Sequence, residues 1–175
     1  MVNNATFNSQ LIGSNTLWPL GKIVCVGRNY AEHIAELNNP TPEEPLLFIK
    51  PATSAAIMQE PLLLPQELGE VHYETEIALL IGKKLSKAEP EVALAAVAGV
   101  GLALDLTLRD LQTQLKSLGH PWERAKAWDG ACPLSDFVPV KEIKDWQELE
   151  LSLKINGLEK QRGKAKKCLP LLLNC

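Results

Sequence analysis

The sequence predicts an α+β fold that is mainly β. Segments with β-branched runs or alternating apolar residues outnumber segments with a helical pattern. The clearest is residues 149–155, where Leu or Ile alternates with polar residues ahead of Asn156-Gly157, a typical two-residue hairpin turn. The length of 175 residues, with 46% hydrophobic and 22% charged residues, suits one soluble globular domain that buries a real core.

The first half of the chain alternates short strands with polar or proline-rich loops. Residues 1–16 are rich in Asn, Ser and Thr, so we expect a loose N-terminal segment and ordered structure from near Leu17. Prolines deny residues 38–45 regular pairing. The predicted elements are a strand at 22–26, a helix at 29–37, a loop at 38–45, a strand at 46–49, an extended passage at 61–65 and a strand at 71–81.

The second half contains two helix-start signals. Ser86 followed by Glu89 fits a capping box, for a helix that Gly99 closes. Thr107 with Asp110 is the second signal. The predicted elements are a helix over 92–97, a buried strand at 100–106, a helix that ends at 118 with Gly119 as its stop, a long functional loop at 121–139, and strands at 149–155 and 158–161.

Composition excludes several classes of partner. A net charge of -3 and a pI near 5.7 argue against nucleic acid or an anionic membrane as the main partner. No apolar run approaches the roughly 20 residues of a membrane helix. The sequence shows neither a C-x-x-C pair nor a signal peptide, so we expect a cytoplasmic protein with inertly buried cysteines.

Acidic residues mark a candidate metal site. Glu74 and Glu76 alternate along the predicted strand and share a face with Ala78, so they are expected at the margin of a buried region. Asp105 interrupts an otherwise apolar run. Burying like charges is costly unless a cation neutralises them, and carboxylates are the ligands that Mg²⁺, Mn²⁺ or Ca²⁺ prefer. The alternative is a wetted strand face, because the sequence alone does not bring the three acids together.

Other residues have two readings each. His33 and Glu36 lie three apart on the predicted helix and form either a general-base pair or a surface salt bridge. Lys126 lies between Trp122 and Trp128, where its ammonium could hold a substrate carboxylate or stabilise an enolate, or its stem could pack on indole.

Two arginines are further candidates. Arg28 follows a strand end, where side chains often reach ligands. Arg109 and Asp110 could equally form a local pair on the helix.

Five motifs in order carry a resemblance to a known family, the fumarylacetoacetate hydrolases, and most of all to their small single-domain acylpyruvases and oxaloacetate decarboxylases or tautomerases. The motifs are Gly27-Arg28-Asn29-Tyr30 with His33 and Glu36; Leu47-Phe48-Ile49-Lys50-Pro51; His72-Tyr73-Glu74-Thr75-Glu76; Asp105-Leu-Thr-Leu-Arg109-Asp110-Leu-Gln112; and Pro121-Trp122-x3-Lys126.

The resemblance implies a mixed β-sandwich roll, usually a homodimer, with Mg²⁺ or Mn²⁺ in the site. It implies metal ligands at Glu74, Glu76 and Asp105, a water-activating dyad at His33 and Glu36, an enolate-assisting Lys126, and substrate contacts from Arg28 and Lys50. The implied activity is on small 2-oxo acids through a metal-stabilised enolate: acylpyruvate hydrolysis, or oxaloacetate decarboxylation or tautomerisation. An isomerase of unsaturated 2-hydroxy dicarboxylates, or a truncated chain with no activity, is the alternative.

The likeness to the family ends after Gly163. Family members would continue with further strands and a Thr-Gly-Thr-Pro loop, whereas this chain ends in Lys164-Ala-Lys-Lys-Cys-Leu-Pro-Leu-Leu-Leu-Asn-Cys175. We therefore expect an N-terminal segment at 1–16, a catalytic domain at 17–163 that is incomplete at its C-terminus, and a divergent tail at 164–175. Such a domain should expose an apolar edge.

Overall fold

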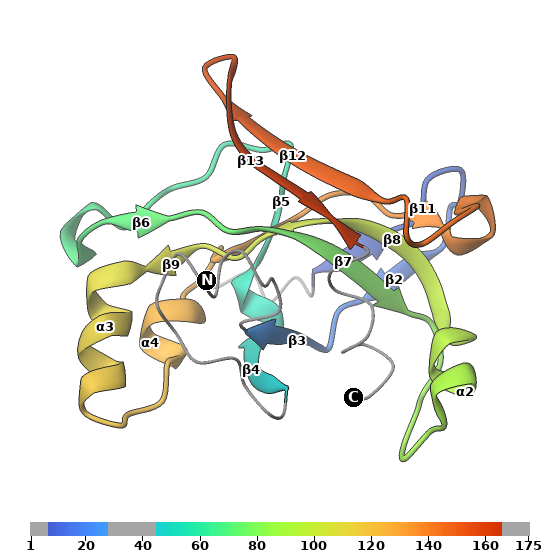
Figure 1. Ribbon diagram of the computed structural model, residues 1–175, viewed down its shortest axis with the longest axis horizontal. Helices are drawn as coiled ribbons and strands as arrows, with labels where there is room; N and C mark the ends of the chain where they lie inside the picture. Colours follow the sequence, from blue (N-terminus) through green and yellow to red (C-terminus); the bar gives the residue numbers. More distant parts are fainter. Residues whose placement is uncertain (1–6, 28–44, 166–175) are drawn as a thin grey trace, which may run out of the picture.

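The computed structural model describes residues 7–27 and 45–165 (Figure 1). The helix predicted at 29–37 lies outside the described residues, and with it Arg28, His33 and Glu36. The strands are β1 (Asn8–Gln10), β2 (Leu17–Pro19), β3 (Lys22–Gly27), β4 (Leu46–Pro51), β5 (Ala55–Ile57), β6 (Val71–His72), β7 (Thr75–Ile81), β8 (Val97–Leu104), β9 (Thr107–Leu108), β10 (Cys132–Leu134), β11 (Val138–Pro139), β12 (Glu150–Ile155) and β13 (Leu158–Lys164). The helices are α2 (Pro90–Leu94), α3 (Arg109–Ser117) and α4 (Glu123–Lys126), with 3-10 turns at Ala52–Ser54, Gln66–Leu68 and Val140–Glu142.

The central sheet is built around β8, its longest strand. β7 pairs antiparallel along one edge of β8, while β10 and β11 pair with the other edge and β5 adds to β10 in parallel. In Figure 1, β7 and β8 cross the middle of the molecule, with α3 and α4 near one end and α2 near the other. The observed class is α+β and mainly β, as the sequence predicts.

The β3–β4 hairpin has two different faces. Val24 lies opposite Ile49, and both are about half exposed, as is Leu47, at 51%, 49% and 50%. Cys25 lies opposite Phe48 on the other face, which also carries the fully buried Lys50. The hairpin therefore turns Phe48 and Lys50 inward and leaves exposed apolar side chains on its outer face.

Two apolar clusters form the core. One is centred on Ala103, Cys132 and Leu134, and Ala78 of β7 packs against it. The other is centred on Leu108, Leu115 and Ala125, with Val71 and both Trp122 and Trp128 packed around it. Since Asp105 lies in the chain between Ala103 and Leu108, the connection between the clusters carries a charged residue.

The strand predicted over 71–81 is broken. β6 pairs with β9, whereas β7 pairs with β8, so Tyr73 and Glu74 connect two different ladders. The prediction of one continuous strand is therefore wrong at these two residues, because tertiary pairing overrides the local pattern.

Both helix-start predictions fail at the residues that motivated them. Glu89 occupies the N-cap without a side-chain capping bond, and Pro90 begins α2. Thr107 belongs to β9, so that Leu108 becomes the N-cap of α3. Gly119, with φ +67°, ends that helix region as predicted.

Residues around Gly99 form a strand, although the sequence predicts a helix end there. Leu80 of β7 pairs with Gly99, and Ile81 pairs with Val97. A Cβ on Gly99 would lie 2.5 Å from Leu11 Cδ2, so the glycine allows close packing of the N-terminal segment.

The structure corrects two further predicted boundaries and confirms the predicted C-terminal hairpin. β1 pairs with β2, so order begins before Leu17. The predicted loop at 121–139 contains α4, β10 and β11. The hairpin of β12 and β13 is confirmed, with positive φ at Asn156 and Gly157, +51° and +80°. Among the helices described, none has the length and apolar character needed to cross a membrane.

Candidate functional site

Two of the predicted acids meet where β7 begins and β8 ends. Thr75 lies opposite Leu104 in the antiparallel ladder, so Glu74 and Asp105 are the next residues beyond that pair. The Asp105 N–H donates to the Glu74 carbonyl at 2.8 Å, which fixes the two backbones together. Glu76 lies one step inside the ladder, opposite Ala103. The predicted margin of a buried region is confirmed, because Ala103 belongs to the core.

Lys126 joins the two acids. Its Nζ donates to Glu74 Oε2 at 2.9 Å and to Asp105 Oδ2 at 2.6 Å, and its side chain is 4% exposed. The ammonium also lies 5.1 Å from the centroid of the Phe48 ring. The structure thus shows the Lys126 ammonium paired with Glu74 and Asp105, and a contact of this ammonium with substrate stays a prediction.

Arg109 is a second cation of the site. Its guanidinium donates to Glu74 Oε1 and, at 2.7 Å, to Gln112 Oε1. Its Nε also lies 3.4 Å from His72 Nδ1. Arg109 therefore binds to the acidic cluster. Its position is set by Glu74 and Gln112, and not by a local pair with Asp110.

The charges around Glu74 control its ionisation. Burial by itself raises the pKa of Glu74, but the charges and hydrogen bonds of Lys126 and Arg109 outweigh burial and lower it from 4.5 to about 2. Glu74 is consequently an anion at neutral pH.

Lys50 lies behind the acids and is fully buried. Its ammonium donates to three carbonyls, those of Leu106 at 3.3 Å, Ala131 at 3.0 Å and Lys126. It also lies 2.9 Å from Asp105 Oδ1, an ion pair in which that buried oxygen accepts no hydrogen bond from the residues described.

Gln161 of β13 stabilises the irregular connection between β6 and β7. Its Oε1 accepts hydrogen bonds from the Thr75 N–H at 3.0 Å and the Thr75 hydroxyl at 2.7 Å, and its Nε2 donates to the Tyr73 carbonyl at 3.1 Å. Glu74 lies between these two anchored residues. The sequence offered no signal for this role, because the contacts join positions 86 and 88 apart in the chain.

The predicted metal ligands are not gathered as an open metal site, although their chemistry suits a metal ion. No three Asp, Glu, His or Cys side chains of residues 7–27 and 45–165 are gathered as a metal-binding group, and Lys126 occupies the position between Glu74 and Asp105. The donor chemistry nevertheless fits. Glu74 is anionic, and Glu74 and Asp105 supply the hard carboxylate oxygens that a divalent cation prefers, with Lys126, Arg109 and Lys50 paired to them in this structure.

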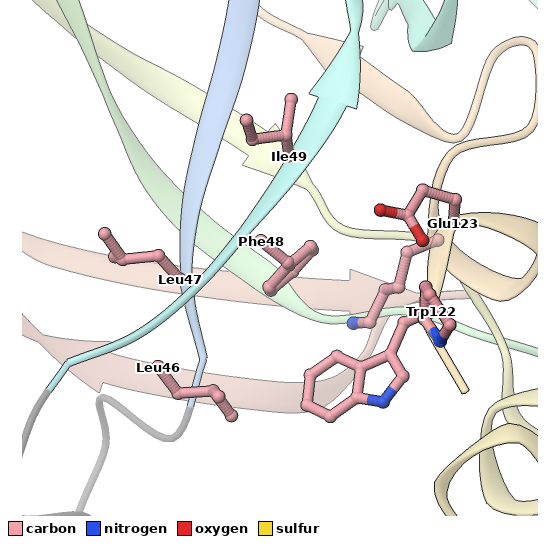
Figure 2. A pocket seen from close by; sticks show the side chains of 8 residues that line it. Leu46, Leu47, Phe48, Ile49, Trp122 and Glu123 are labelled. Carbon is pink, nitrogen blue, oxygen red and sulfur yellow. The ribbon is translucent and has the colours of Figure 1, made fainter. Parts of the chain in front are cut away.

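An apolar groove opens beside Lys126 (Figure 2). Phe48 and Trp122 form its walls, with ring centroids 6.0 Å apart. The groove encloses about 360 Å³ and is lined by Leu46, Leu47, Phe48, Ile49, Pro121, Trp122, Glu123 and Lys126.

The two described cysteines have no nucleophilic setting. Burial raises the pKa of Cys25 to about 12, with a further contribution from the nearby Asp105 charge. Burial likewise raises the pKa of Cys132 to about 11. Both thiols are protonated at neutral pH, as expected for inert buried cysteines.

Similarity to known proteins covers most of the chain. Residues 22–170 match the family described as Fumarylacetoacetate (FAA) hydrolase C-terminal. The oxaloacetate tautomerase YcgM of Escherichia coli K12 is 51% identical over 147 residues, which are 83% of this chain and 67% of that protein. The mitochondrial oxaloacetate tautomerase FAHD1 of Bos taurus is 44% identical over 147 residues, 83% of this chain and 66% of that protein. This chain thus spans about two thirds of the length of these curated relatives.

A solved structure shares the fold. The fumarylpyruvate hydrolase of Pseudomonas aeruginosa, in complex with Mn²⁺ and pyruvate, superimposes with a TM-score of 0.90 at 31% sequence identity. The match covers 99% of this chain and 76% of that one. The predicted fold is therefore confirmed.

Proposed function

Because the chain belongs to the fumarylacetoacetate hydrolase family, we propose that it is a divalent-metal-dependent enzyme of 2-oxo acids whose main reaction is keto–enol tautomerisation of oxaloacetate. The observation that carries this proposal is the Lys126 ammonium bound to both Glu74 and Asp105. Two carboxylates are donors that a divalent cation prefers, and the ammonium beside them could stabilise an enolate formed at that metal.

The proposed metal ligands are Glu74, Glu76 and Asp105, and the proposed metal is Mg²⁺ or Mn²⁺. Support comes from the meeting of Glu74 with Asp105, from the anionic state of Glu74, and from the Mn²⁺ named with the Pseudomonas relative. When bound, the metal would act as a Lewis acid for the two adjacent oxygens of a 2-oxo acid.

The charges of the site favour a dicarboxylate. The acids Glu74, Glu76 and Asp105 are formally balanced by Lys50, Lys126 and Arg109. A divalent metal would therefore leave an excess positive charge equal to its own, and oxaloacetate carries two carboxylates that match it.

The protein's own groups supply the rest of the chemistry. Tautomerisation removes a proton from the carbon between the ketone and the distal carboxylate and delivers a proton to the ketone oxygen. The Lys126 ammonium is proposed to stabilise the negative charge on that oxygen, and water or Lys126 to carry the proton. Arg28, which lies outside the described residues, is also proposed to bind the substrate.

Acylpyruvate hydrolysis is the second candidate, and the apolar groove beside Lys126 favours it. The groove would accept an apolar acyl group, which oxaloacetate lacks. In that reaction His33, oriented by Glu36, would deprotonate a water that attacks the distal carbonyl. Oxaloacetate decarboxylation and isomerisation of unsaturated 2-hydroxy dicarboxylates are the remaining candidate reactions, and the substrates of all four reactions form the panel to be assayed.

Assembly and location complete the proposal. A homodimer in the cytoplasm is proposed, and the exposed apolar face of the β3–β4 hairpin supports burial of some surface by association.

The test is an assay of the purified chain, after its oligomeric state has been measured. We expect loss of the enol absorbance of oxaloacetate to depend on Mg²⁺ or Mn²⁺ and to stop on addition of a chelator. Glu76→Gln should lower the rate by at least roughly 10²-fold, as expected for a lost metal ligand, whereas Glu60→Gln, at an exposed position, should leave it unchanged.

Three outcomes discriminate between the hypotheses. Turnover that persists in the chelator would reject the metal mechanism. Faster metal-dependent cleavage of acetylpyruvate than tautomerisation of oxaloacetate would favour the hydrolase. If the protein is monodisperse and folded but turns over no substrate of the panel, the chain has no catalytic activity.

A further inference from the structure

Lys50 has every donor of its ammonium engaged by the protein. An ammonium carries three N–H groups, and those of Lys50 meet the carbonyls of Leu106, Lys126 and Ala131. The side chain has no exposed surface. A substrate carboxylate could reach this ammonium only by displacing buried hydrogen bonds, which would leave carbonyls without partners.

We infer that Lys50 is a positioning residue, which holds Asp105 and Lys126 in register and does not itself contact substrate. The inference rests on the proposed function, in which Asp105 binds the metal and Lys126 stabilises the enolate. It replaces the substrate contact that the family resemblance implied for Lys50.

The carbonyls that Lys50 binds belong to the segments that carry the site. Leu106 directly follows Asp105, and the second carbonyl is that of Lys126 itself, at the C-terminal end of α4. Ala131 closes the network, since its carbonyl also accepts the Leu106 N–H at 3.0 Å. One buried side chain from β4 thus fixes the backbones of both functional residues.

Lys50 also acts on the Asp105 carboxylate directly. Its Nζ lies 2.9 Å from Oδ1, while Lys126 donates to Oδ2. Because the hydrogens of Lys50 are directed at carbonyls, Oδ1 is held by charge and accepts no hydrogen bond from the residues described. This arrangement orients the carboxylate from both of its oxygens.

The first experiment compares Lys50→Met with Lys22→Met, at an exposed lysine of the neighbouring strand. We expect Lys50→Met to weaken Mn²⁺ binding, measured by electron paramagnetic resonance, by roughly 10–100-fold and to lower kcat. The KM for oxaloacetate at saturating Mn²⁺ should stay within about twofold. A raised KM with unchanged Mn²⁺ affinity would overturn the inference, and Lys22→Met should change neither quantity.

The second experiment uses the wild-type protein and decides the question even if Lys50→Met does not fold. Acetic anhydride labelling, read by mass spectrometry without metal or substrate, should modify exposed Lys154 and Lys160 but spare Lys50. Labelling of Lys50 as fast as of these lysines, with protection by oxaloacetate, would overturn the inference. If the wild-type protein binds no Mn²⁺, the proposed function fails, while the labelling result still decides whether Lys50 is a closed structural anchor.

Discussion

Gln161→Leu should destabilise the protein and loosen Glu74. The substitution keeps the approximate size of the side chain and removes the acceptor of the Thr75 N–H and hydroxyl, together with the donor to the Tyr73 carbonyl. Thr75 is only 8% exposed, so its groups lose their partner where water does not readily replace it.

The magnitude follows from the groups left unpaired. Each buried unsatisfied donor or acceptor costs about 1–3 kcal/mol, and partial burial of the new leucine returns some of that. A net loss of about 2–4 kcal/mol is therefore expected in the free energy of unfolding. With a urea m-value of about 2 kcal/mol/M, the midpoint should fall by roughly 1–2 M at constant m.

Urea unfolding followed by tryptophan fluorescence measures this change. Lys160→Leu, at the exposed preceding residue of β13, is the matched control and should shift the midpoint by less than about 0.5 M. In a double-mutant cycle, Thr75→Val should couple to Gln161→Leu, because the two residues share hydrogen bonds. Equal midpoints for the Gln161 and Lys160 variants, or strict additivity in the cycle, would refute the reasoning.

Three further predictions concern ionisation and packing. In metal-free protein, the low pKa of Glu74 contributes about 3 kcal/mol of stability, which is complete above pH 4.5 and is lost as the pH falls towards 2. Glu74→Gln should therefore reduce the change in urea midpoint between pH 6 and pH 3, and an unchanged pH dependence would contradict this. Iodoacetamide at pH 8 should leave Cys25 and Cys132 unmodified in folded protein and alkylate both in urea, as mass spectrometry of the peptides would reveal; rapid alkylation of native protein would contradict their raised pKa values. Gly99→Ala should cost about 1–3 kcal/mol in urea unfolding because its Cβ would lie 2.5 Å from Leu11 Cδ2, while Gly21→Ala, with no atom within 4 Å of the new Cβ, should be close to neutral.

Local pattern predicted the elements that depend on local chemistry. The β12–β13 hairpin has a two-residue turn at Asn156 and Gly157, whose positive φ values need those residue types. The helix stop at Gly119 is of the same kind. By contrast, the break at Tyr73 and Glu74 could not be read from the sequence, because it arises from two ladders that pair with distant strands.

Helix starts were less predictable for a similar reason. The Ser86 and Glu89 pattern matched a capping box, yet Pro90 set the first helical position without a side-chain bond. Thr107 does not cap the helix but belongs to β9, where its hydroxyl donates to the Asp105 carbonyl at 3.1 Å. Side chains that cap helices also satisfy other backbone groups, and the tertiary structure chooses between them.

The sequence by itself determined the mainly β class, the family, and the acidic and basic residues from which a site can be made, because these depend on residue type and order. Only the tertiary structure decided that Lys126 and Arg109 share Glu74, that Lys50 is enclosed by carbonyls, and that Gln161 supports the broken strand. The physical reason is that an ion pair or hydrogen bond depends on distance and burial. Both are fixed only when segments far apart in the chain pack together.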